Sequence, residues 1–235
     1  MFFDMNISVI IPLYNEEKSI KKIIKKVSKI NIEKEIIVVN DGSTDKSLKI
    51  IKELKIKNLK IINNKKNNGK GHAIRCALKY VNKDIVVIQD ADLEYDPRDY
   101  FKLLEPFKKK NLSIVYGSRF LNEKFFILKK GINYNFRSIL NRLLTSMFNI
   151  LNNQKITDAH TCYKLFDSKI IPKLKLVENG FSFCPEFSTK VSKLGYKIYE
   201  VPISYNPRSK SEGKKISYID GFQAIRTLIK FRFFD

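Results

Sequence analysis

Short runs of Val and Ile alternate with amphipathic segments through the first half of the chain, and this alternation restricts the fold more than any other feature. Such runs are typical of strands buried on both faces of a sheet. The segments between them place apolar residues at helical spacing, with lysines opposite. This order predicts right-handed βαβ units and a parallel sheet. The expected strands are Ile7–Pro12, Glu35–Asn40, Leu59–Asn63 and Asp84–Gln89, and the expected helices are Glu16–Ile30, a segment through Leu48, Ile51 and Leu54, and Gly71–Val81.

The second half of the sequence is less regular. We expect helices at Asp99–Lys110, Asn135–Asn152 and Tyr218–Phe234, and strands at Ser113–Gly117 and Ile198–Ser204. Within 235 residues we find no repeat, linker or low-complexity tail. The chain is therefore expected to form a single α/β domain, with a Rossmann-like, mostly parallel sheet flanked by helices.

The charge balance is strongly basic, with a formal net charge of +21. An anionic partner would explain it: nucleic acid, phospholipid or a phosphorylated substrate. An AT-rich coding bias toward Lys, Asn and Ile explains it equally well. Only eight of the 45 basic residues are arginines. Each Arg is therefore expected to be present for the bidentate contacts that its guanidinium can form, rather than for its charge alone. The arginines singled out for this reason are Arg119, Arg137, Arg142 and Arg208.

The rest of the composition bears on the compartment. No apolar run approaches the roughly 18 residues of a membrane-spanning helix, and the first residues lack the pattern of a signal peptide. Cys76, Cys162 and Cys184 are scattered without metal-ligand spacing. We therefore expect a cytoplasmic protein without disulfides or structural zinc.

Polar segments follow all four early strands, at the sheet edge where open parallel sheets bind ligands. They are Pro12–Glu16, Asn40–Ser43, Asn67–Gly71 and Asp90–Asp92. Any one of them alone can be an ordinary turn or helix cap. Four at the same edge predict a binding site.

The triplet Asp90-Ala91-Asp92 carries the most specific chemistry. Two carboxylates so near to each other would repel when buried. A divalent cation removes this repulsion and can bridge the carboxylates to a diphosphate. Oxygen ligands favour Mg²⁺ or Mn²⁺ over zinc, and Glu94 stands at the next alternate position. The alternative is a solvated acidic turn.

Gly69-Lys70-Gly71 precedes a predicted helix and matches neither a Walker motif nor a dinucleotide fingerprint. Its glycines would still let backbone amides approach a nucleotide. His72 beside it is expected to cap or pack rather than to catalyse.

Together these motifs resemble the family 2 glycosyltransferases with a GT-A fold, in particular the branch that transfers mannose or glucose to dolichyl or polyprenyl phosphate. The resemblance covers about Ser8 to Gly221, and DADLEYDP and YGSR are its most specific motifs. The matching segments are SVIIPLYNEE, EIIVVNDGSTD, NNGKGHAI, DIVVIQDADLEYDP, IVYGSRF, ITDAHTCYKLF, GYKIYEVPISY and EGKKISYIDG.

The resemblance implies a nucleotide-sugar half at about 6–119 and an acceptor half at about 120–235, the latter ending in an amphipathic helix. Asp92 and Glu94 would hold Mg²⁺ or Mn²⁺; many members have Gln in place of Glu94. Asp158 would support the site structurally. The implied nucleotide-sugar residues are Pro12, Tyr14, Glu16, Asp41, Gly69, Lys70 and Asp90; the catalytic residues are Asp92, Arg119, Arg208 and Lys214; the acceptor-phosphate residues are Arg119, Arg137, Asn141 and Arg142. Asn141 stands where the family has Ser.

The resemblance also implies inverting transfer of a hexose from a GDP-mannose or UDP-glucose type donor to polyprenyl phosphate. An already ionised acceptor needs no general base, and the sequence offers no obvious one. Phe120–Phe136 and the C-terminal FQAIRTLIKFRFFD mix apolar and basic residues, which predicts peripheral binding at the cytoplasmic membrane face, with a membrane-anchored partner subunit as a further option.

Three alternative functions remain at this point. A family 2 enzyme can instead glycosylate a sugar hydroxyl, for which a carboxylate base would be required. A nucleotidyltransferase would need a glycine-rich first loop, which is missing after Ile11. A basic nucleic-acid-binding protein would leave the acidic triplet without a purpose, so no nucleic-acid partner is expected.

Overall fold

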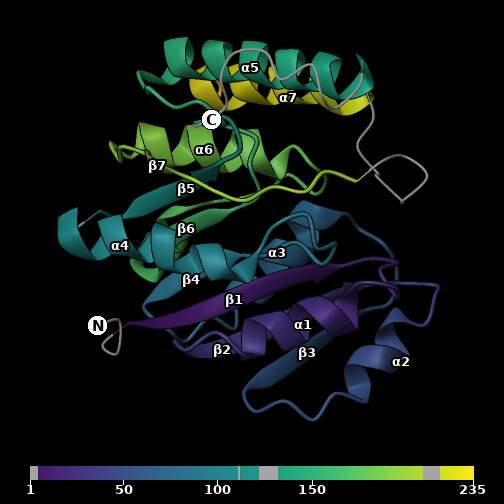
Figure 1. The fold of residues 1–235 in the computed structure, drawn as a ribbon. Coiled ribbons are helices and arrows are strands. Elements are labelled where there is room, and N and C mark those ends of the chain that lie inside the picture. Colours follow the sequence, from purple (N-terminus) through teal and green to yellow (C-terminus); the bar gives the residue numbers. More distant parts are fainter. Residues whose placement is uncertain (1–4, 111, 122–131, 209–217) are drawn as a thin grey trace.

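The computed structural model describes residues 5–110, 112–121, 132–208 and 218–235. It contains one seven-stranded sheet with helices on both faces (Figure 1). The strands are β1 (Asn6–Leu13), β2 (Glu33–Asp41), β3 (Leu59–Asn64), β4 (Ile85–Ile88), β5 (Ile114–Ser118), β6 (Lys164–Asp167) and β7 (Tyr199–Pro202). The helices are α1 (Ile20–Ser28), α2 (Ser47–Lys52), α3 (Lys70–Leu78), α4 (Tyr100–Lys110), α5 (Ile132–Asn152), α6 (Phe183–Lys193) and α7 (Tyr218–Phe233), with short 3₁₀ helices η1 (Pro97–Asp99) and η3 (Ser168–Lys173).

The strand order is β3-β2-β1-β4-β6-β5-β7. The pairs among β3, β2, β1 and β4 are parallel, as the strand–helix alternation predicts. β6 runs antiparallel to both of its neighbours, and β5 pairs with β7 in parallel. The predicted α/β fold with a mostly parallel sheet is therefore confirmed, with one reversed strand, β6, between β4 and β5.

Two elements of the second half, β6 and α6, were not predicted from the sequence. β6 has only four residues, and one of them is the fully buried Lys164. α6 is buried around almost its whole circumference and has Pro185 in its first turn. It therefore shows no amphipathic stripe, although Ser182 precedes it and Glu186 lies in its first turn, as at many helix starts.

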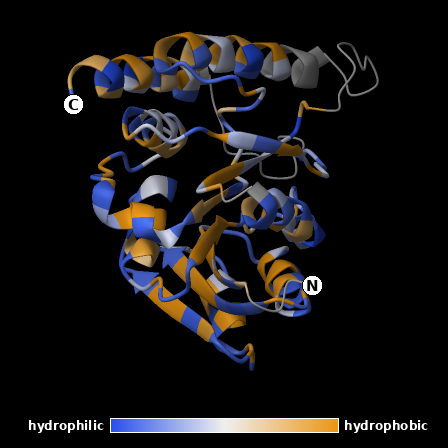
Figure 2. Ribbon diagram, turned by 90° about the vertical axis from the view of Figure 1, so that its left-hand side faces the viewer, coloured by the Kyte–Doolittle hydropathy of each residue, from blue (hydrophilic) through white to orange (hydrophobic). Residues whose placement is uncertain are grey.

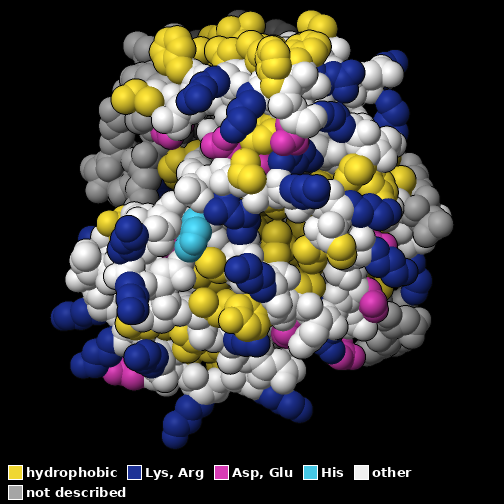
Figure 3. Space-filling model, turned by 180° about the vertical axis from the view of Figure 1, so that it is seen from behind, with side chains coloured by type: hydrophobic (Ala, Val, Ile, Leu, Met, Phe, Trp, Pro, Cys, Tyr) yellow, Lys and Arg dark blue, Asp and Glu magenta, His cyan; other side chains and the backbone are white. Residues whose placement is uncertain are grey.

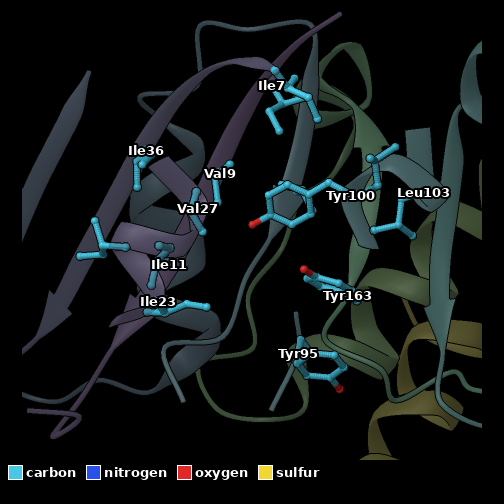
Figure 4. Packing of buried hydrophobic residues seen from close by; sticks show 14 of the residues in the cluster. Ile7, Val9, Ile11, Ile23, Val27, Ile36, Tyr95, Tyr100, Leu103 and Tyr163 are labelled. Carbon is cyan, nitrogen blue, oxygen red and sulfur yellow. The ribbon is translucent and has the colours of Figure 1, made fainter. Parts of the chain in front are cut away.

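Two apolar clusters fill the space on either side of the sheet. On one side α1 and α4 pack on the strands, with Ile23, Val27 and Leu103 in the contact (Figure 4). On the other side α3 and α6 pack on the sheet, and α5 and α7 lie side by side beyond α6 (Figure 1). Figure 2 shows hydrophobic residues concentrated on the strands, whereas α5 and α7 at the top carry both kinds. None of the described helices has the length and apolar character needed to cross a bilayer.

Candidate active site

The acidic triplet follows β4 and Gln89, and β4 pairs in parallel with β1 on one side and antiparallel with β6 on the other. Gln89, fully buried, accepts hydrogen bonds at Oε1 from the hydroxyls of Tyr100 and Tyr163, each at 2.9 Å. Its Nε2 donates to the backbone oxygen of Asp90 at 3.1 Å. The rings of Tyr100 and Tyr163 lie next to each other in the core, with their centroids 5.7 Å apart (Figure 4). A satisfied polar group thus fixes the chain where the triplet begins.

Backbone geometry then turns Asp92 and Glu94 toward the same guanidinium. Leu93 between them has φ 67°, in the left-handed region that is rare for a branched side chain. Oδ1 of Asp92 accepts from the backbone N–H of Glu94 at 3.0 Å. This reversal brings two carboxylates two residues apart in sequence onto one partner. The sequence prediction that they share a site is consistent with this geometry.

That partner is Arg208, which follows β7. Its Nη2 donates to Oδ2 of Asp92 at 2.9 Å, and Nη1 donates to Oε2 of Glu16 at 3.0 Å. Its backbone N–H donates to Oε1 of Glu94 at 2.8 Å, while Nε lies 3.7 Å from the same oxygen. Three predicted site residues from the loops after β1 and β4 therefore meet on one predicted arginine.

Burial shapes the electrostatics of this cluster. Withdrawal from water raises the pKa of Asp92 to about 7, and the nearby charges of Asp90 and Glu94 add to the shift, while Arg208 opposes it. A divalent cation would remove the repulsion among these carboxylates. As the side chains stand, no three His, Cys, Asp or Glu residues in the described parts of the chain form a ready metal site. The donor chemistry still fits Mg²⁺ or Mn²⁺, because Asp92 and Glu94 offer only oxygen ligands.

Tyr205 links the carboxylates to the second cationic group. Its hydroxyl donates to Oε2 of Glu94 at 2.8 Å, and the Arg119 guanidinium lies 5.3 Å from the centre of its ring. Arg119 and Tyr205 also line a cavity of about 370 Å³, together with Lys102, Ser118, Pro202, Ile203 and Ser204. The sequence analysis did not single out Tyr205, although it ends the motif VPISY.

Arg119 is held by a buried carboxylate. Its Nε and Nη2 donate to the two carboxylate oxygens of Asp158, at 2.7 and 2.8 Å. Asp158 is fully buried; burial opposes its ionisation, but the charge and hydrogen bonds of Arg119 outweigh that effect and keep its pKa below the usual range. Glu200 fixes the backbone of Asp158 from the other side at 2.9 Å. The supporting role predicted for Asp158 fits this arrangement, whereas Glu200 was missed.

The loop after β2 is tied to the glycine loop. Oδ2 of Asp41 accepts from the backbone N–H groups of Asn68 and Gly69 at 2.9 and 2.7 Å, and its Oδ1 accepts from Nδ2 of Asn64 at 2.7 Å. Gly69 has φ 100°, and a Cβ there would lie 2.5 Å from the backbone oxygen of Asn179. Only glycine meets both conditions. Asp41 thus holds the glycine loop in place. Asp41 and Gly69 were both predicted to bind the nucleotide sugar, and the structure brings them into contact.

Lys70 begins α3 and reaches across to the acidic triplet. Its ammonium group contacts Oδ1 of Asp90 and lies 2.8 Å from Sγ of Cys162. Burial disfavours its charge, but Asp90 and the neighbouring thiols more than compensate, so its pKa stands well above the ordinary value. Lys70 and Asp90, predicted separately as nucleotide-sugar residues, therefore form a largely buried cation–anion contact two residues before Asp92.

The remaining predicted residues lie around this centre. Pro12 pairs with Val39 at the end of β1, and Tyr14 is half-buried in the following loop. On α5, Asn141 and Arg142 are half-buried, and the Arg142 guanidinium lies 4.8 Å from the ring centre of Phe120. The side chain of Arg137 and the whole of Lys214 fall outside the described residues.

Comparison with known proteins defines the class to which this fold and site belong. The sequence profile of glycosyl transferase family 2 matches residues 8–174, and the chain belongs to that family. The dolichyl-phosphate beta-glucosyltransferase ALG5A of Trichomonas vaginalis is 30% identical over 246 residues, covering 97% of this chain and 73% of the relative. A UDP-N-acetylglucosamine–dolichyl-phosphate N-acetylglucosaminyltransferase of Methanococcus voltae is 30% identical over 234 residues, or 91% of each protein.

The fold also matches that of glucosyl-3-phosphoglycerate synthase from Mycobacterium tuberculosis, solved with Mn²⁺, UDP and phosphoglyceric acid. The TM-score is 0.73 at 18% identity, with 98% of this chain and 80% of the other covered. The protein is therefore a GT-A glycosyltransferase, as the motifs predicted. Family membership favours this class over a nucleotidyltransferase or a nucleic-acid-binding protein.

Proposed function

We propose that this glycosyltransferase moves a hexose from a nucleoside diphosphate sugar to a polyprenyl phosphate at the cytoplasmic face of a membrane. The observation that supports this most directly is the juxtaposition of two charged groups. Tyr205 contacts both Glu94, the neighbour of Asp92 in the acidic cluster, and the guanidinium of the Arg119–Asp158 pair. The proposed sites for the donor diphosphate and for the acceptor phosphate would thus be adjacent.

On the donor side, Asp92 and Glu94 would hold Mg²⁺ or Mn²⁺, which neutralises charge that develops on the departing nucleoside diphosphate. Arg208 adds a second positive group at the same carboxylates. The loops of Asp41 and Gly69, held together by the hydrogen bond from Gly69 to Asp41, would hold the nucleotide. Lys70, fixed by Asp90, supplies a further cation.

On the acceptor side, Arg119 is the group that would receive a phosphate. Its side chain is only 10% exposed, and its bidentate pair with Asp158 keeps the guanidinium in one orientation. An oxygen of the acceptor phosphate would attack the anomeric carbon as the bond to the diphosphate oxygen breaks. Because that phosphate is already ionised near neutral pH, no side chain has to remove a proton.

The acceptor class can be tested with purified protein, Mn²⁺, a panel of GDP-linked and UDP-linked hexoses, and a short polyprenol with or without its phosphate. We expect sugar transfer only to the phosphorylated lipid. If free polyprenol or a sugar hydroxyl is glycosylated as fast as the phosphorylated lipid, the alternative in which the acceptor is a hydroxyl group is supported instead.

The surface that would face the lipid is formed by α5 and α7, and we call it the α5–α7 face. Of the fourteen large hydrophobic side chains exposed among the described residues, nine lie here. Figure 3 shows them as a band along the top of the molecule, with lysines and arginines below. A contiguous group of exposed apolar side chains on a soluble domain commonly marks a surface that binds a protein or a membrane. They are Ile139, Leu143, Ile150, Ile219, Phe222, Ile225, Ile229, Phe233 and Phe234.

The charges around this face favour an anionic bilayer surface as its occupant. The charged residues at exposed positions of α7 include Arg226 and Lys230, and its one acidic residue, Asp220, is half-buried. A helix with an outward apolar stripe and basic flanks lies in the interface plane of a membrane. Arg142, near the acceptor side of the site, belongs to the same α5 helix.

Flotation with vesicles of phosphatidylcholine and phosphatidylglycerol tests this surface. We expect the wild type to float and a Phe222→Glu/Ile229→Glu variant to remain at the bottom. Tyr80→Glu is the matched control, because Tyr80 is 43% exposed and lies after α3, beside Lys60 of β3. Equal flotation of all three proteins, or concentration-dependent dimers without lipid binding, would contradict a lipid-facing role.

A further inference from the structure

A short stretch between η3 and α6 lies directly against the glycine loop at the start of α3. We call residues 177–180 the clamp segment. The backbone N–H of Gly71 donates to the oxygen of Gly180 at 3.3 Å, and that of His72 donates to the oxygen of Asn179 at 3.0 Å. The start of a helix leaves such N–H groups without partners inside the helix. The clamp segment therefore supplies the partners that fix the glycine loop to the first turn of α3.

The clamp segment and the glycine loop approach each other so closely that side chains are excluded between them. A Cβ at Gly71 would collide with the backbone oxygen of Glu178, and a Cβ at Gly69 would lie 2.5 Å from that of Asn179. Lys70, which contacts Asp90, stands between these two glycines. A displacement of the clamp segment must therefore also displace the loop that carries this lysine.

A buried carboxylate holds the clamp segment from α6. Glu186 lies in the first turn of that helix and is fully buried. Its Oε1 accepts from the backbone N–H of Val177 at 2.7 Å, and its Oε2 accepts from that of Glu178 at 2.8 Å. Lys190, one turn further along α6, lies 3.1 Å from Oε1. Hydrogen bonds to a charged group are stronger than those between neutral groups, so α6 determines where the clamp segment lies.

Arg75 holds the same segment from α3. Its Nη1 donates to the backbone oxygen of Glu178 at 2.7 Å, and its Nη2 donates to Oδ1 of Asn179 at 2.6 Å. The clamp segment is thus held through its N–H groups by one helix and through its oxygens by another. The sequence analysis singled out neither Glu186 nor Arg75.

We propose that Glu186 is a positioning residue for nucleotide-sugar binding, which holds the clamp segment and through it the glycine loop with Lys70. This role rests on the proposed function, because it takes the glycine loop as part of the donor site. Glu186 acts through the backbone of residues 177 and 178 and not by contact with the donor. Its removal should therefore weaken donor binding and leave turnover at saturating donor nearly unchanged.

Hydrogen exchange of the protein without ligand, followed by NMR, tests the clamp independently of the proposed function. In Glu186→Gln an NH₂ group replaces one of the two accepting oxygens, and we expect the amides of Gly71 and His72 to exchange about tenfold faster. Glu35→Gln is the matched control, because Glu35 is also buried and accepts a backbone N–H, that of Asn82 at 2.9 Å, but lies near the start of β2. It should leave both amides as in the wild type. Unchanged exchange in a folded Glu186→Gln variant would overturn the proposal.

Calorimetric titration with UDP and with GDP in Mn²⁺ tests the consequence for donor binding. We expect Glu186→Gln to bind nucleotide about tenfold more weakly than the wild type, as for the loss of one hydrogen bond to a charged group. Its kcat at saturating donor should stay within about twofold, and Glu35→Gln should keep the wild-type affinity. Faster exchange with unchanged affinity would refute the link to donor binding. If the wild type binds neither nucleotide, the proposed function fails and the role in donor binding fails with it, while the exchange data still decide whether Glu186 holds the loop.

Arg75→Ala decides the question if Glu186→Gln does not fold. Arg75 is half-buried and holds the clamp segment from the other helix. We expect faster exchange of the same two amides and about threefold weaker nucleotide binding. Wild-type exchange and wild-type affinity in this variant would show that the glycine loop keeps its place without the clamp segment, which would overturn the proposal.

Discussion

Nη2 of Arg208 lies 2.9 Å from Oδ2 of Asp92, so a cation supplied by the chain itself rests on the carboxylate that we propose as a metal ligand. The same guanidinium is held by Glu16 at 3.0 Å. Metal and arginine would therefore share these carboxylates when the donor binds. This arrangement gives the segment after β7 a direct electrostatic connection to the donor site.

Removal of this arginine should separate metal binding from turnover. In Arg208→Ala we expect Mn²⁺ to bind about tenfold more tightly without nucleotide, because a positive charge beside the carboxylates is lost. Sugar transfer should fall by about 100-fold, since that charge also stabilises the leaving diphosphate. Calorimetric Mn²⁺ titration and a transfer assay measure the two effects. Lys109→Ala, which removes an exposed cation on α4, is the control, and unchanged Mn²⁺ affinity in Arg208→Ala would argue against shared ligands.

Loss of the buried partner of Arg119 should be costly for stability. In Asp158→Asn, the guanidinium stays buried without its counter-charge, and we expect a loss of about 3 kcal/mol in the free energy of unfolding. Urea denaturation measures it. Glu105→Gln removes an exposed pair with Lys109 and should have no measurable effect. Equal stability of Asp158→Asn and the wild type would show that Arg119 is satisfied by other groups.

Two glycines with positive φ offer a matched comparison. A Cβ at Gly69 would lie 2.5 Å from the backbone oxygen of Asn179, whereas a Cβ at Gly195 would meet nothing within 4 Å. Gly195→Ala should thus cost only the left-handed strain of about 1–2 kcal/mol. Gly69→Ala should cost clearly more and should also abolish nucleotide binding, because the loop braced by Asp41 must move. Equal melting temperatures for the two variants would contradict this account.

His160 should make stability depend on pH. Burial lowers its pKa to about 4, and Lys164 and Arg119 add to the shift against the charge of Asp158. The unfolded chain, with an ordinary histidine pKa near 6.5, then binds a proton that the folded protein excludes. Stability should fall as the pH drops from about 7 toward 4, with a slope of up to about 1.4 kcal/mol per pH unit. Urea denaturation between pH 7 and 5 should show a smaller slope for His160→Gln than for the wild type, and an unchanged slope would rule out this histidine as the cause.

The parallel half of the fold was predictable because its strands are long apolar runs separated by clear helices. Ile7, Val9 and Ile11 on β1 face the core as the pattern indicates. The position of β6, antiparallel between β4 and β5, was not predictable, because a lysine such as Lys164 is normally expected at the surface and not in a buried strand. In the structure its ammonium group lies 3.7 Å above the Tyr116 ring and bonds to a backbone oxygen, contacts that only the folded chain supplies.

The residues of the candidate site were likewise predictable only in part. The rule that parallel strands place their carboxyl-end loops together correctly grouped Asp41 with Gly69, and Glu16 with Asp92. Tyr205, Glu200 and Cys162 were missed as site residues. Their contacts depend on how β7 and the segment before β6 cross the sheet, and no local spacing in the sequence encodes that crossing.

The central claim is that the carboxylate of Asp92 acts on the donor diphosphate through a divalent cation. The most direct measurement is the rate of hexose transfer to polyprenyl phosphate in Mn²⁺ for the wild type, Asp92→Asn and Asp84→Asn, an exposed carboxylate near the opposite end of β4. We expect Asp92→Asn to lose transfer by about 100-fold or more while it keeps its melting temperature, and Asp84→Asn to match the wild type. Undiminished transfer by a folded Asp92→Asn variant would contradict the account.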